Sequence, residues 1–429
     1  MSFNTISVIG LGYIGLPTAA MFASRKKNVI GVDVNQHAVD TINRGEIHIV
    51  EPDLDMIVHA AVTEGYLKAV TSPEPADAFL IAVPTPFKST LNTKSDSAIP
   101  EPDLSYIKKA SEAIAPVLKK GDLVILESTS PVGATEQMAE WLAAARPDLS
   151  FPSPNKESAG EETDVNVAHC PERVLPGHVV RELVENDRVI GGMTAKCSAR
   201  AVELYKTFVQ GECVITNART AEMAKLTENS CRDVQIAFAN ELSIICDKLN
   251  IDVWELISLA NRHPRINILQ PGPGVGGHCI AVDPWFIVSK TPDEAQLIHT
   301  ARKVNDAKPQ WVINKVKLAI TDFLQANPTK TAKDVTIACY GLAFKPDIDD
   351  LRESPALNIT KQIADLHAGK VMGVEPNISD LPKSINTFQL STFVTAKSTA
   401  DIHLLLVDHK EFKDVVFKSD YLIDTKGIW

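Results

Sequence analysis

The 429-residue sequence predicts an α/β protein in which two doubly wound domains are joined by a central helical domain with one long helix. Three observations lead to this prediction. Short apolar runs alternate with helical segments near the N-terminus, an unbroken helical pattern occupies the middle, and the last hundred residues weakly repeat the first plan. We expect the domains to span residues 1–205, 206–315 and 316–429.

The N-terminal domain is predicted to begin with a strand, a glycine-rich turn, a helix and a second strand. The apolar runs Ile6–Ile9 and Asn28–Val34 are the two strands, and further buried strands are expected at Ala78–Val83 and Leu123–Glu127. Their nearly continuous hydrophobicity is typical of a parallel sheet with helices on both faces. The polar segment Lys88–Asp103 has no periodicity, so we expect an exposed, mobile loop there.

The turn after the first strand has the glycine spacing of a dinucleotide-binding fingerprint. It comprises Gly10, Gly12, Tyr13, Ile14 and Gly15. The first glycine allows the turn, the second lets the backbone approach a pyrophosphate, and the third lets the helix pack on the strand. The pyrophosphate would meet the helix N-terminus, which favours an anion. Asp33 ends the second strand and is placed to bind a ribose 2′-hydroxyl and to repel a 2′-phosphate. The sequence therefore predicts a Rossmann-like domain that binds NAD rather than NADP.

The middle of the chain predicts one long helix from Asn217 to about Leu249, a stretch without proline or glycine. Its apolar stripe consists of Cys231, Val234, Phe238, Leu242 and Ile245. Such a helix is long enough to join two domains and to offer a dimerisation surface. Lys225 and Asn229 stand four residues apart and share a face. An ammonium and an amide donor could stabilise a developing oxyanion, although a solvent-exposed face is the ordinary explanation for such a pair.

The last hundred residues echo the strands of the N-terminal domain. The matching segments are Val335–Tyr340, Val371–Asn377, Ile402–Val407 and Tyr421–Asp424. Their glycine turn is degenerate, because Gly341-Leu-Ala343 lacks the second and third glycines, and no second dinucleotide site is expected there.

Lys345, Arg352 and Ser354 cluster just past the first of these strands, where open α/β sheets bind ligands. A nucleotide diphosphate would suit the cluster, and a solvated run of charges is the alternative.

Cys279 stands out among the cysteines by its sequence context. It follows Gly274, Gly276, Gly277 and His278. Glycines let a substrate approach the backbone closely, and a thiolate is a strong nucleophile even when little of it is present. We therefore expect Cys279 to be chemically active, the alternative being a buried structural cysteine. The role of His278 is left open between orienting the thiol and packing.

Composition excludes several classes of partner and site. The formal net charge of −11 provides no electrostatic footprint for nucleic acid or an anionic membrane. No apolar run approaches the roughly 18 residues of a membrane helix, and Met1–Asn4 lacks the basic region of a signal peptide. Seven widely spaced cysteines without a CxxC pair indicate free thiols in a reducing cytoplasm. Eleven scattered histidines show no HExxH spacing, so no metal is expected. Glu51 and Asp53 lie in a polar segment and are expected at the surface.

Seven motifs occur along the chain in a fixed order. They are GLGYIGLP, VPTP (Val83–Pro86), ESTSPVG (Glu127–Gly133), PERVLPG (Pro171–Gly177), AEMAKLTEN (Ala221–Asn229), PGPGVGGHCIAVDP (Pro271–Pro284) and GLAFKPDIDDLRESP (Gly341–Pro355). Together they resemble the UDP-glucose/GDP-mannose dehydrogenase family over nearly the whole chain. The resemblance implies an NAD-binding N-terminal domain, a helical centre that forms a homodimer, and a C-terminal domain that binds a UDP-sugar.

The family oxidises the C6 primary alcohol of a sugar to a carboxylate in two steps and reduces two NAD⁺. The resemblance implies that Cys279 traps the intermediate aldehyde as a thiohemiacetal, which a second hydride transfer converts to a thioester. It implies that Lys225 and Asn229 hold the oxyanion, and that Asp283 and Thr129 position water.

The resemblance also assigns the remaining positions of the two ligand sites. Glu172 matches the family's glutamate that acts as general acid and base during hydrolysis. Arg265 matches an arginine that reaches the substrate of the partner subunit. Further cofactor contacts are implied for Thr85, Thr129 and Arg352. Substrate contacts are implied for Glu172, Arg173, Val174, Lys225, Asn229, Arg265, Gly276 and Lys345.

One departure from the family pattern concerns the substrate. UDP-glucose enzymes commonly carry a second glutamate where Pro176 stands here. The PERVLPG form, with GGHCIAVDPWF, resembles the branch that acts on UDP-N-acetylhexosamines. Within this branch, it most resembles the enzymes that convert UDP-N-acetyl-D-mannosamine (UDP-ManNAc) to UDP-N-acetyl-D-mannosaminuronate (UDP-ManNAcA). That product serves bacterial surface polysaccharide such as enterobacterial common antigen. The departure alone does not name the C2 epimer, so UDP-N-acetyl-D-glucosamine (UDP-GlcNAc) and UDP-glucose are alternatives.

Two other function classes explain only part of the sequence. A single-step β-hydroxyacid dehydrogenase would explain the N-terminal half and Lys225 but would need neither Cys279 nor a third domain. A non-catalytic NAD-responsive binding protein would keep the glycine fingerprint but has no reason for Lys225, Cys279 and Asp283 together.

Overall fold

The computed structural model of the chain describes residues 3–49, 51–88, 99–153, 162–175, 177–277, 279–382, 384–417 and 419–429. Pro176, His278 and residues 89–98 of the expected loop lie outside these ranges. The chain divides into two compact units, each described by itself. The first comprises Met1–Glu228 and Trp285–Thr291, and the second Asn229–Pro284 and Pro292–Trp429.

The first unit is built on one sheet. Its strands are β1 (Thr5–Ile9), β2 (Asn28–Val32), β3 (Leu67–Val70), β4 (Ala78–Ile81), β5 (Leu123–Leu126), β6 (Asn166–His169), β7 (Arg188–Gly192) and β8 (Cys213–Asn217). They are ordered β3-β2-β1-β4-β5-β6-β7-β8, and every neighbouring pair is parallel except β6 and β7. β1 therefore lies between β2 and β4, which is the arrangement of a doubly wound domain.

Helices cover both faces of this sheet. They are α1 (Gly15–Ser24), α2 (Gln36–Asn43), α3 (Leu54–Thr63), α4 (Ser105–Ile114), α5 (Ala134–Ala145), α6 (Val179–Glu185) and α7 (Ala195–Tyr205), with a short 3₁₀ helix η1 (Ala115–Val117). Successive strand residues face opposite sides: Leu123 and Ile125 pack with α1, α6 and α7, whereas Val124 and Leu126 pack with α4 and α5. The two cores explain why the predicted strands are hydrophobic at nearly every position.

The second unit contains a smaller parallel sheet. Its strands are β9 (Ile337–Tyr340), β10 (Val371–Val374), β11 (Gln389–Leu390), β12 (Ile402–Leu405) and β13 (Leu422–Asp424). Their order, β11-β10-β9-β12-β13, repeats the order β3-β2-β1-β4-β5 of the first sheet. The weak sequence repeat is therefore a repeat of topology, and the predicted fold class is confirmed.

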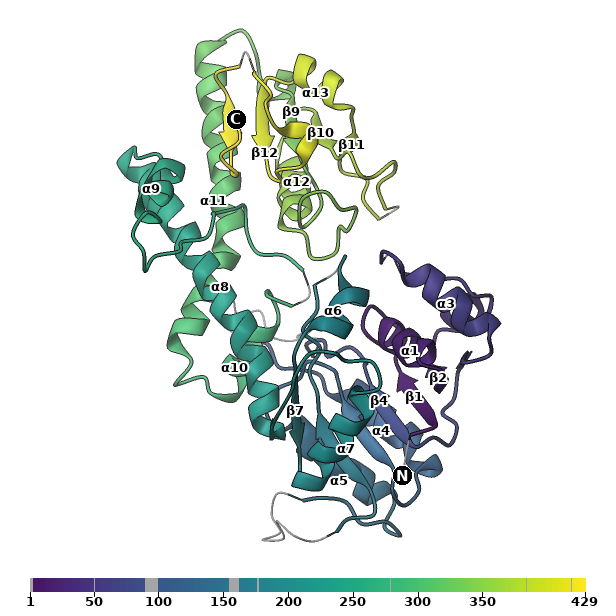
Figure 1. The fold of residues 1–429 in the computed structure, drawn as a ribbon. Helices are drawn as coiled ribbons and strands as arrows, with labels where there is room; N and C mark the ends of the chain where they lie inside the picture. The colour runs from purple at the N-terminus through teal and green to yellow at the C-terminus, as the bar shows by residue number, and fades with distance from the viewer. Residues whose placement is uncertain are drawn as a thin grey trace. The chain divides into compact units, whose positions relative to one another are not determined.

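Helices of the second unit pack on this sheet or extend from it. They are α9 (Val253–Ala260), α11 (Gln296–Ala326), α12 (Pro355–Leu366) and α13 (Phe393–Thr399), with 3₁₀ helices η2 (Ala332–Asp334) and η3 (Lys410–Phe412). α11 runs along the second sheet and packs against α12 and β12 (Figure 1). Two more helices, α8 (Ala218–Leu249) and α10 (Asp283–Lys290), have residues in both units.

The long helix α8 confirms the helix predicted over Asn217–Leu249, but its buried face is polar. Asp233 is buried and pairs with Arg302 of α11 at 2.7 Å, and Asn240 donates to Asn305 of α11 at 2.9 Å. Such groups tolerate burial because they bond one another. The apolar stripe faces outward instead: Phe238 is 54% exposed and Ile245 43%.

The expectation that Glu51 lies at the surface is wrong. Its carboxylate is buried and accepts the backbone N–H groups of Gly177 and Val179 at 3.0 and 2.8 Å, at the start of α6. An acidic side chain is stabilised there by the unpaired N–H groups of the first helical turn. Asp53 is exposed, as expected. Among the described helices, none has the length and apolar character needed to cross a membrane.

Candidate active site

The dinucleotide turn uses its three glycines for different reasons. A Cβ atom on Gly10, whose φ is +91°, would lie 2.6 Å from the Ala82 carbonyl oxygen, and one on Gly15 only 1.8 Å from the Gly10 carbonyl oxygen. The fold itself therefore requires these two glycines. A Cβ on Gly12 would meet nothing within 4 Å. The open space at Gly12 is the space that a pyrophosphate needs.

Asp33 is held toward this turn. Its Oδ2 accepts the Leu11 N–H at 2.9 Å, and its Oδ1 accepts the Asn35 N–H at 2.8 Å. Each oxygen keeps a lone pair that could accept a ribose hydroxyl. The N-terminus of α1, where Ile14 is the N-cap residue, has no side-chain cap. The shielded Thr85 hydroxyl has no hydrogen-bond partner among the described residues. These unused groups and the open turn fit NAD.

Glu222 ties the loop that carries Thr129 to the first turns of α8. Its buried carboxylate accepts the Gly133 N–H at 2.6 Å, the Thr135 N–H at 2.8 Å and the Thr135 hydroxyl at 2.6 Å. It thereby caps α5 from a neighbouring helix. Half-buried Thr129 precedes these bonds, and half-buried Lys225 follows Glu222 by one turn of α8. The glutamate has no local sequence signal, because the residues that it caps lie about ninety positions away.

Glu172 is a buried carboxylate with a fixed orientation. Its Oε2 pairs with the buried Arg188 at 2.7 Å, and its Oε1 accepts the Arg173 N–H at 2.7 Å. The Arg173 side chain binds Glu228 of α8 at 2.6 Å, and Val174 packs partly against the core beside α1. The structure thus gathers Glu172, Arg173 and Val174 at the end of β6, as expected for one motif.

In the second unit, Asn229 and Asp283 meet directly. The Asn229 amide donates to Asp283 Oδ2 at 2.5 Å, and the Asp283 N–H donates to the Cys279 carbonyl at 2.9 Å. Three of the predicted catalytic residues are therefore linked through two bonds, even though fifty residues separate Asn229 from the other two.

Cys279 is exposed, whereas Cys170, Cys197, Cys246 and Cys339 are buried, and none of the seven cysteines forms a disulfide. Burial raises the pKa of the Cys170 and Cys339 thiols to about 12, which leaves them unreactive at neutral pH.

The glycines before Cys279 let its segment lie flush against the C-terminal motif that contains Lys345 and Arg352. A Cβ on Gly276 would lie 2.6 Å from the Glu353 carbonyl oxygen and 2.6 Å from Pro355 Cδ. The structure thus brings the Cys279 segment to the predicted nucleotide-diphosphate cluster. Lys345 is half-buried there, and the Arg352 guanidinium bonds Asp350 at 2.6 Å. Arg265 is exposed on the segment after α9, and no described contact links it to this cluster.

The second glycine turn is occupied by a protein side chain. Glu375, the counterpart of Asp33, accepts the N–H groups of Leu342 and Ala343 at 2.7 and 3.0 Å. A pyrophosphate would need those donors. Among the described residues, His409, Asp347 and Glu411 form one group with metal-ligand spacing. His409 Nδ1 already accepts the Asp347 N–H, and its Nε2 lies 3.0 Å from Glu375 Oε2, so the group serves as a loop anchor.

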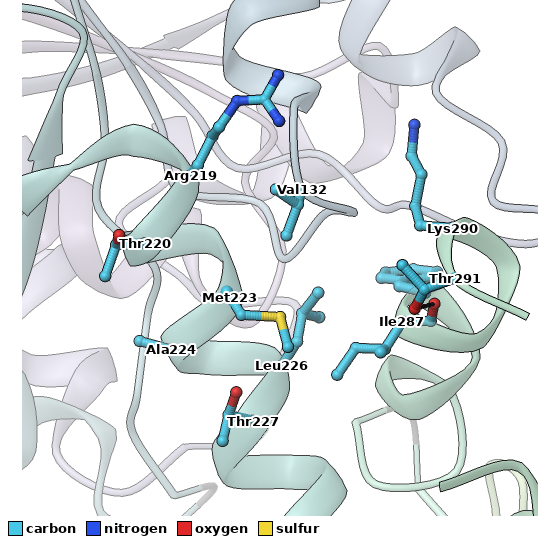
Figure 2. Close-up of a pocket in the computed structure, with 11 residues that line it drawn as sticks. Val132, Arg219, Thr220, Met223, Ala224, Leu226, Thr227, Ile287, Lys290 and Thr291 are labelled. Carbon is cyan, nitrogen blue, oxygen red and sulfur yellow. Dashed lines mark hydrogen bonds between the residues drawn. The ribbon is translucent and has the colours of Figure 1, made fainter. Parts of the chain in front are cut away.

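The first unit contains a cavity of about 710 Å³, lined mainly by residues of α8 and α10. Figure 2 shows Met223 and Leu226 of α8 facing Ile287 of α10 across it, with Arg219 and Lys290 at its edge. None of the predicted site residues lines this cavity, and its walls are mainly apolar. Its chemistry does not suit a charged nucleotide.

Family models match three consecutive parts of the chain. The UDP-glucose/GDP-mannose dehydrogenase family NAD binding domain matches residues 4–209, its central domain residues 219–307, and its UDP binding domain residues 338–429. The chain belongs to the UDP-glucose/GDP-mannose dehydrogenase family. It is thus an NAD-dependent nucleotide-sugar dehydrogenase, which confirms the predicted cofactor and class of enzyme and disfavours a non-catalytic NAD-binding protein.

Individual relatives are similar over their full lengths. The chain is 67% identical to UDP-N-acetyl-D-mannosamine dehydrogenase of Yersinia pestis, with 100% of both chains covered. It is 63% identical to NDP-N-acetyl-D-galactosaminuronic acid dehydrogenase of Ralstonia nicotianae, covering 100% of this chain and 97% of the relative. Among solved structures, UDP-D-ManNAc dehydrogenase from Pyrococcus horikoshii matches with a TM-score of 0.85 and 36% identity, covering 99% of this chain and 96% of that one.

Proposed function

We propose that the protein oxidises the C6 alcohol of UDP-ManNAc to the carboxylate of UDP-ManNAcA, for surface polysaccharide synthesis. The observation that carries the reaction type is the exposed Cys279, whose segment lies against the Lys345 motif of the matched UDP binding domain. The choice of sugar is supported by the relative that is 67% identical over both full chains.

The chemistry is a four-electron oxidation with a covalent intermediate. When bound, NAD would supply the hydride acceptor for each of the two oxidations. After the first, the Cys279 thiolate adds to the C6 aldehyde and forms a thiohemiacetal, which keeps the aldehyde from hydrating or leaving. The second oxidation gives the thioester, which water hydrolyses to the carboxylate and the free thiol.

The remaining residues act on charge and protons. Lys225 and Asn229 donate to the oxyanion that develops at C6, and the bond to Asp283 holds the Asn229 amide so that its second N–H can point to substrate. Asp283 and Thr129 position water, and Glu172 takes a proton from it. Gly276 gives room to the sugar nucleotide, and Arg173, Val174 and Lys345 contact it. Gly10, Gly12, Tyr13, Ile14, Gly15, Asp33, Thr85, Thr129 and Arg352 bind NAD.

Three domains would divide these tasks. Residues 1–205 bind NAD, 206–315 supply catalytic groups and a dimer interface, and 316–429 bind the UDP-sugar. The exposed stripe of α8 supports a homodimer in which Arg265 reaches the partner's substrate, because an exposed Phe238 and Ile245 favour burial against another surface. The proposed catalytic thiol favours a reducing cytoplasm.

Light scattering after size-exclusion chromatography tests the homodimer. Phe238→Asp should convert the protein to monomers, because it places a charge in the apolar stripe. Leu318→Asp is the matched control, since Leu318 is equally exposed, at 58%, on α11. A dimeric Phe238→Asp variant would exclude the α8 stripe as the interface.

Side-by-side kinetics with UDP-ManNAc, UDP-GlcNAc, UDP-N-acetyl-D-galactosamine and UDP-glucose test the substrate. UDP-N-acetyl-D-galactosamine belongs in the panel because a relative with a galactosaminuronic acid name is 63% identical. We expect the highest kcat/KM with UDP-ManNAc. A higher kcat/KM with any other sugar would refute the assignment.

A further inference from the structure

Glu172 belongs to a buried network that also contains Arg188, Tyr205 and a second carboxyl group, Glu127. Glu127 has no role in the chemistry above. Glu127 directly follows β5 and is 1% exposed. Its Oε1 accepts the Tyr205 hydroxyl of α7 at 2.5 Å. Its Oε2 is shielded from solvent and has no hydrogen-bond partner in the described part of the chain. A buried carboxyl oxygen without a donor is costly as an anion, so this oxygen is a natural place for a proton.

Arg188 is the one positive charge that acts on both carboxyl groups among the described residues facing them. It pairs with Glu172 Oε2 at 2.7 Å and attracts Glu127 through space. Its guanidinium lies 4.7 Å from the centre of the Tyr205 ring, which places it against the hydroxyl-bearing partner of Glu127. A single cation cannot fully neutralise two buried carboxylates, so the pair favours a state in which one of them is protonated.

The other titratable neighbours stay neutral. The Cys170 thiol lies 3.8 Å from Arg188, and burial raises its pKa to about 12. Burial likewise raises the pKa of the Tyr205 hydroxyl above its usual value. Neither group therefore titrates near neutral pH, which leaves Glu127 as the member of the network whose charge changes there.

We propose that Glu127 is a positioning residue for the hydrolytic step: it shares Arg188 with Glu172 and, once ionised, weakens the Arg188–Glu172 ion pair, which leaves the Glu172 carboxylate available to accept the proton of water. The proposal rests on the role given to Glu172 above. In the step, water attacks the thioester carbon and its O–H proton passes to the Glu172 carboxylate. The C–S bond then breaks and the electron pair leaves on Cys279 Sγ. The proton on Glu172 is later lost to solvent. The step involves no oxidation or reduction.

Glu127 changes its charge near neutral pH. Burial, opposed by the attraction of Arg188, raises the pKa of its carboxyl to about 7. Below that pH, Arg188 pairs with the Glu172 carboxylate alone. Above it, the Glu127 anion competes with Glu172 for the same guanidinium.

The test compares the pH dependence of thioester hydrolysis in the wild type and Glu127→Gln. Glutamine has the shape of the protonated carboxyl but cannot ionise. Rapid quench separates hydride transfer, seen as NADH, from hydrolysis, seen as release of the uronate. We expect equal hydrolysis rates at pH 6 and a roughly tenfold slower rate in Glu127→Gln at pH 8.5, with hydride transfer unchanged.

Two further variants separate tuning from structure. Asp122→Asn is the matched control, because Asp122 is also a buried carboxyl and immediately precedes β5. It should keep the wild-type inflection near pH 7. Tyr205→Phe removes the hydroxyl that donates to Glu127 and should move the inflection to higher pH. A merely structural network would slow both steps at every pH and would leave no inflection to move.

An infrared difference titration gives a readout without turnover. A protonated carboxyl band should disappear as the pH rises through about 7 in the wild type and be missing in Glu127→Gln. Identical hydrolysis profiles for the wild type and Glu127→Gln, or no such band in the wild type, would overturn the proposal. Intact mass spectrometry distinguishes a failure of the proposed function from a failure of the role given to Glu127. If no sugar adduct forms on Cys279, the proposed four-electron reaction is refuted. If the adduct forms but the pH dependence of hydrolysis is the same in the wild type and Glu127→Gln, only the role of Glu127 is refuted.

Discussion

Replacing Gly12 with alanine should weaken NAD binding while making the protein without cofactor slightly more stable. A Cβ atom at Gly12 would meet nothing within 4 Å, and its φ lies outside the left-handed region. Alanine there restricts the unfolded chain and should stabilise the fold by about 0.5 kcal/mol. That gain corresponds to a rise in Tm of about 1–2 °C for a domain of this size.

The same methyl group would stand in the space that a pyrophosphate needs. Loss of the close backbone approach should raise the Kd for NAD at least about tenfold, equivalent to 1.4 kcal/mol. Gly15→Ala is the matched contrast, because its Cβ would lie 1.8 Å from the Gly10 carbonyl oxygen. That overlap should lower stability by about 3 kcal/mol whether or not NAD is present.

Isothermal titration calorimetry with NAD and thermal unfolding without it measure both effects on the same samples. The expected pattern is a higher Tm with weaker binding for Gly12→Ala, and a lower Tm for Gly15→Ala. A Gly12→Ala variant that binds NAD within twofold of the wild type would refute the assignment of this turn to the pyrophosphate.

Three more substitutions test separate parts of the account. Cys279→Ala should abolish formation of the uronate while NAD still binds, and full turnover measured by NADH absorbance would exclude the thioester route. Lys225→Ala should lower kcat much more than it raises KM, because an oxyanion exists only as the reaction proceeds, and an effect confined to KM would contradict that role. Glu127→Gln should flatten the dependence of stability on pH. The folded-state pKa of Glu127 is raised from 4.5 to about 7, so the folded protein keeps a proton that the unfolded chain releases, and stability falls as the pH rises through this window. Urea unfolding at pH 5 and pH 8 should show a loss of roughly 2 kcal/mol in the wild type that is missing from Glu127→Gln, and parallel curves would contradict the raised pKa.

Local sequence pattern predicted the parts of the fold that depend on neighbouring residues. Strands such as β4 and β5 are short and apolar at every position, so their hydrophobic runs mark them directly. The glycine turn after β1 is equally local, because a strand, three spaced glycines and a helix occur within twenty residues. The repeated strand order in the two sheets follows from the weak repeat of the same units.

Features that depend on distant partners could not be predicted in this way. The buried face of α8 carries Asp233 and Asn240, whose partners lie on α11 about seventy residues away, so the apolar stripe was the more visible pattern and is the exposed one. Glu51 was expected at the surface because its polar neighbours are exposed, yet it caps a helix more than a hundred residues further along the chain.

The candidate site shows the same division. The context of Cys279 marked it within a single motif that also contains Asp283. Asn229 was brought into consideration by its spacing from Lys225, before the structure joined it to Asp283. Glu127 lies inside a recognised motif but was not singled out, because its importance comes from Tyr205 and Arg188, which become its neighbours only in the folded sheet. Glu222 was missed for the same reason.

The ratio of NADH formed to UDP-ManNAc consumed tests the central claim most directly. Oxidation of a primary alcohol to a carboxylate removes four electrons, and each NAD⁺ accepts two, so one sugar should yield two NADH. The measurement combines NADH absorbance at completion with chromatographic quantification of the residual UDP-sugar and the uronate. A ratio of about two, with UDP-ManNAcA as product, is the predicted result. A ratio of one, with an aldehyde as product, would contradict the four-electron reaction and the role of Cys279 in it.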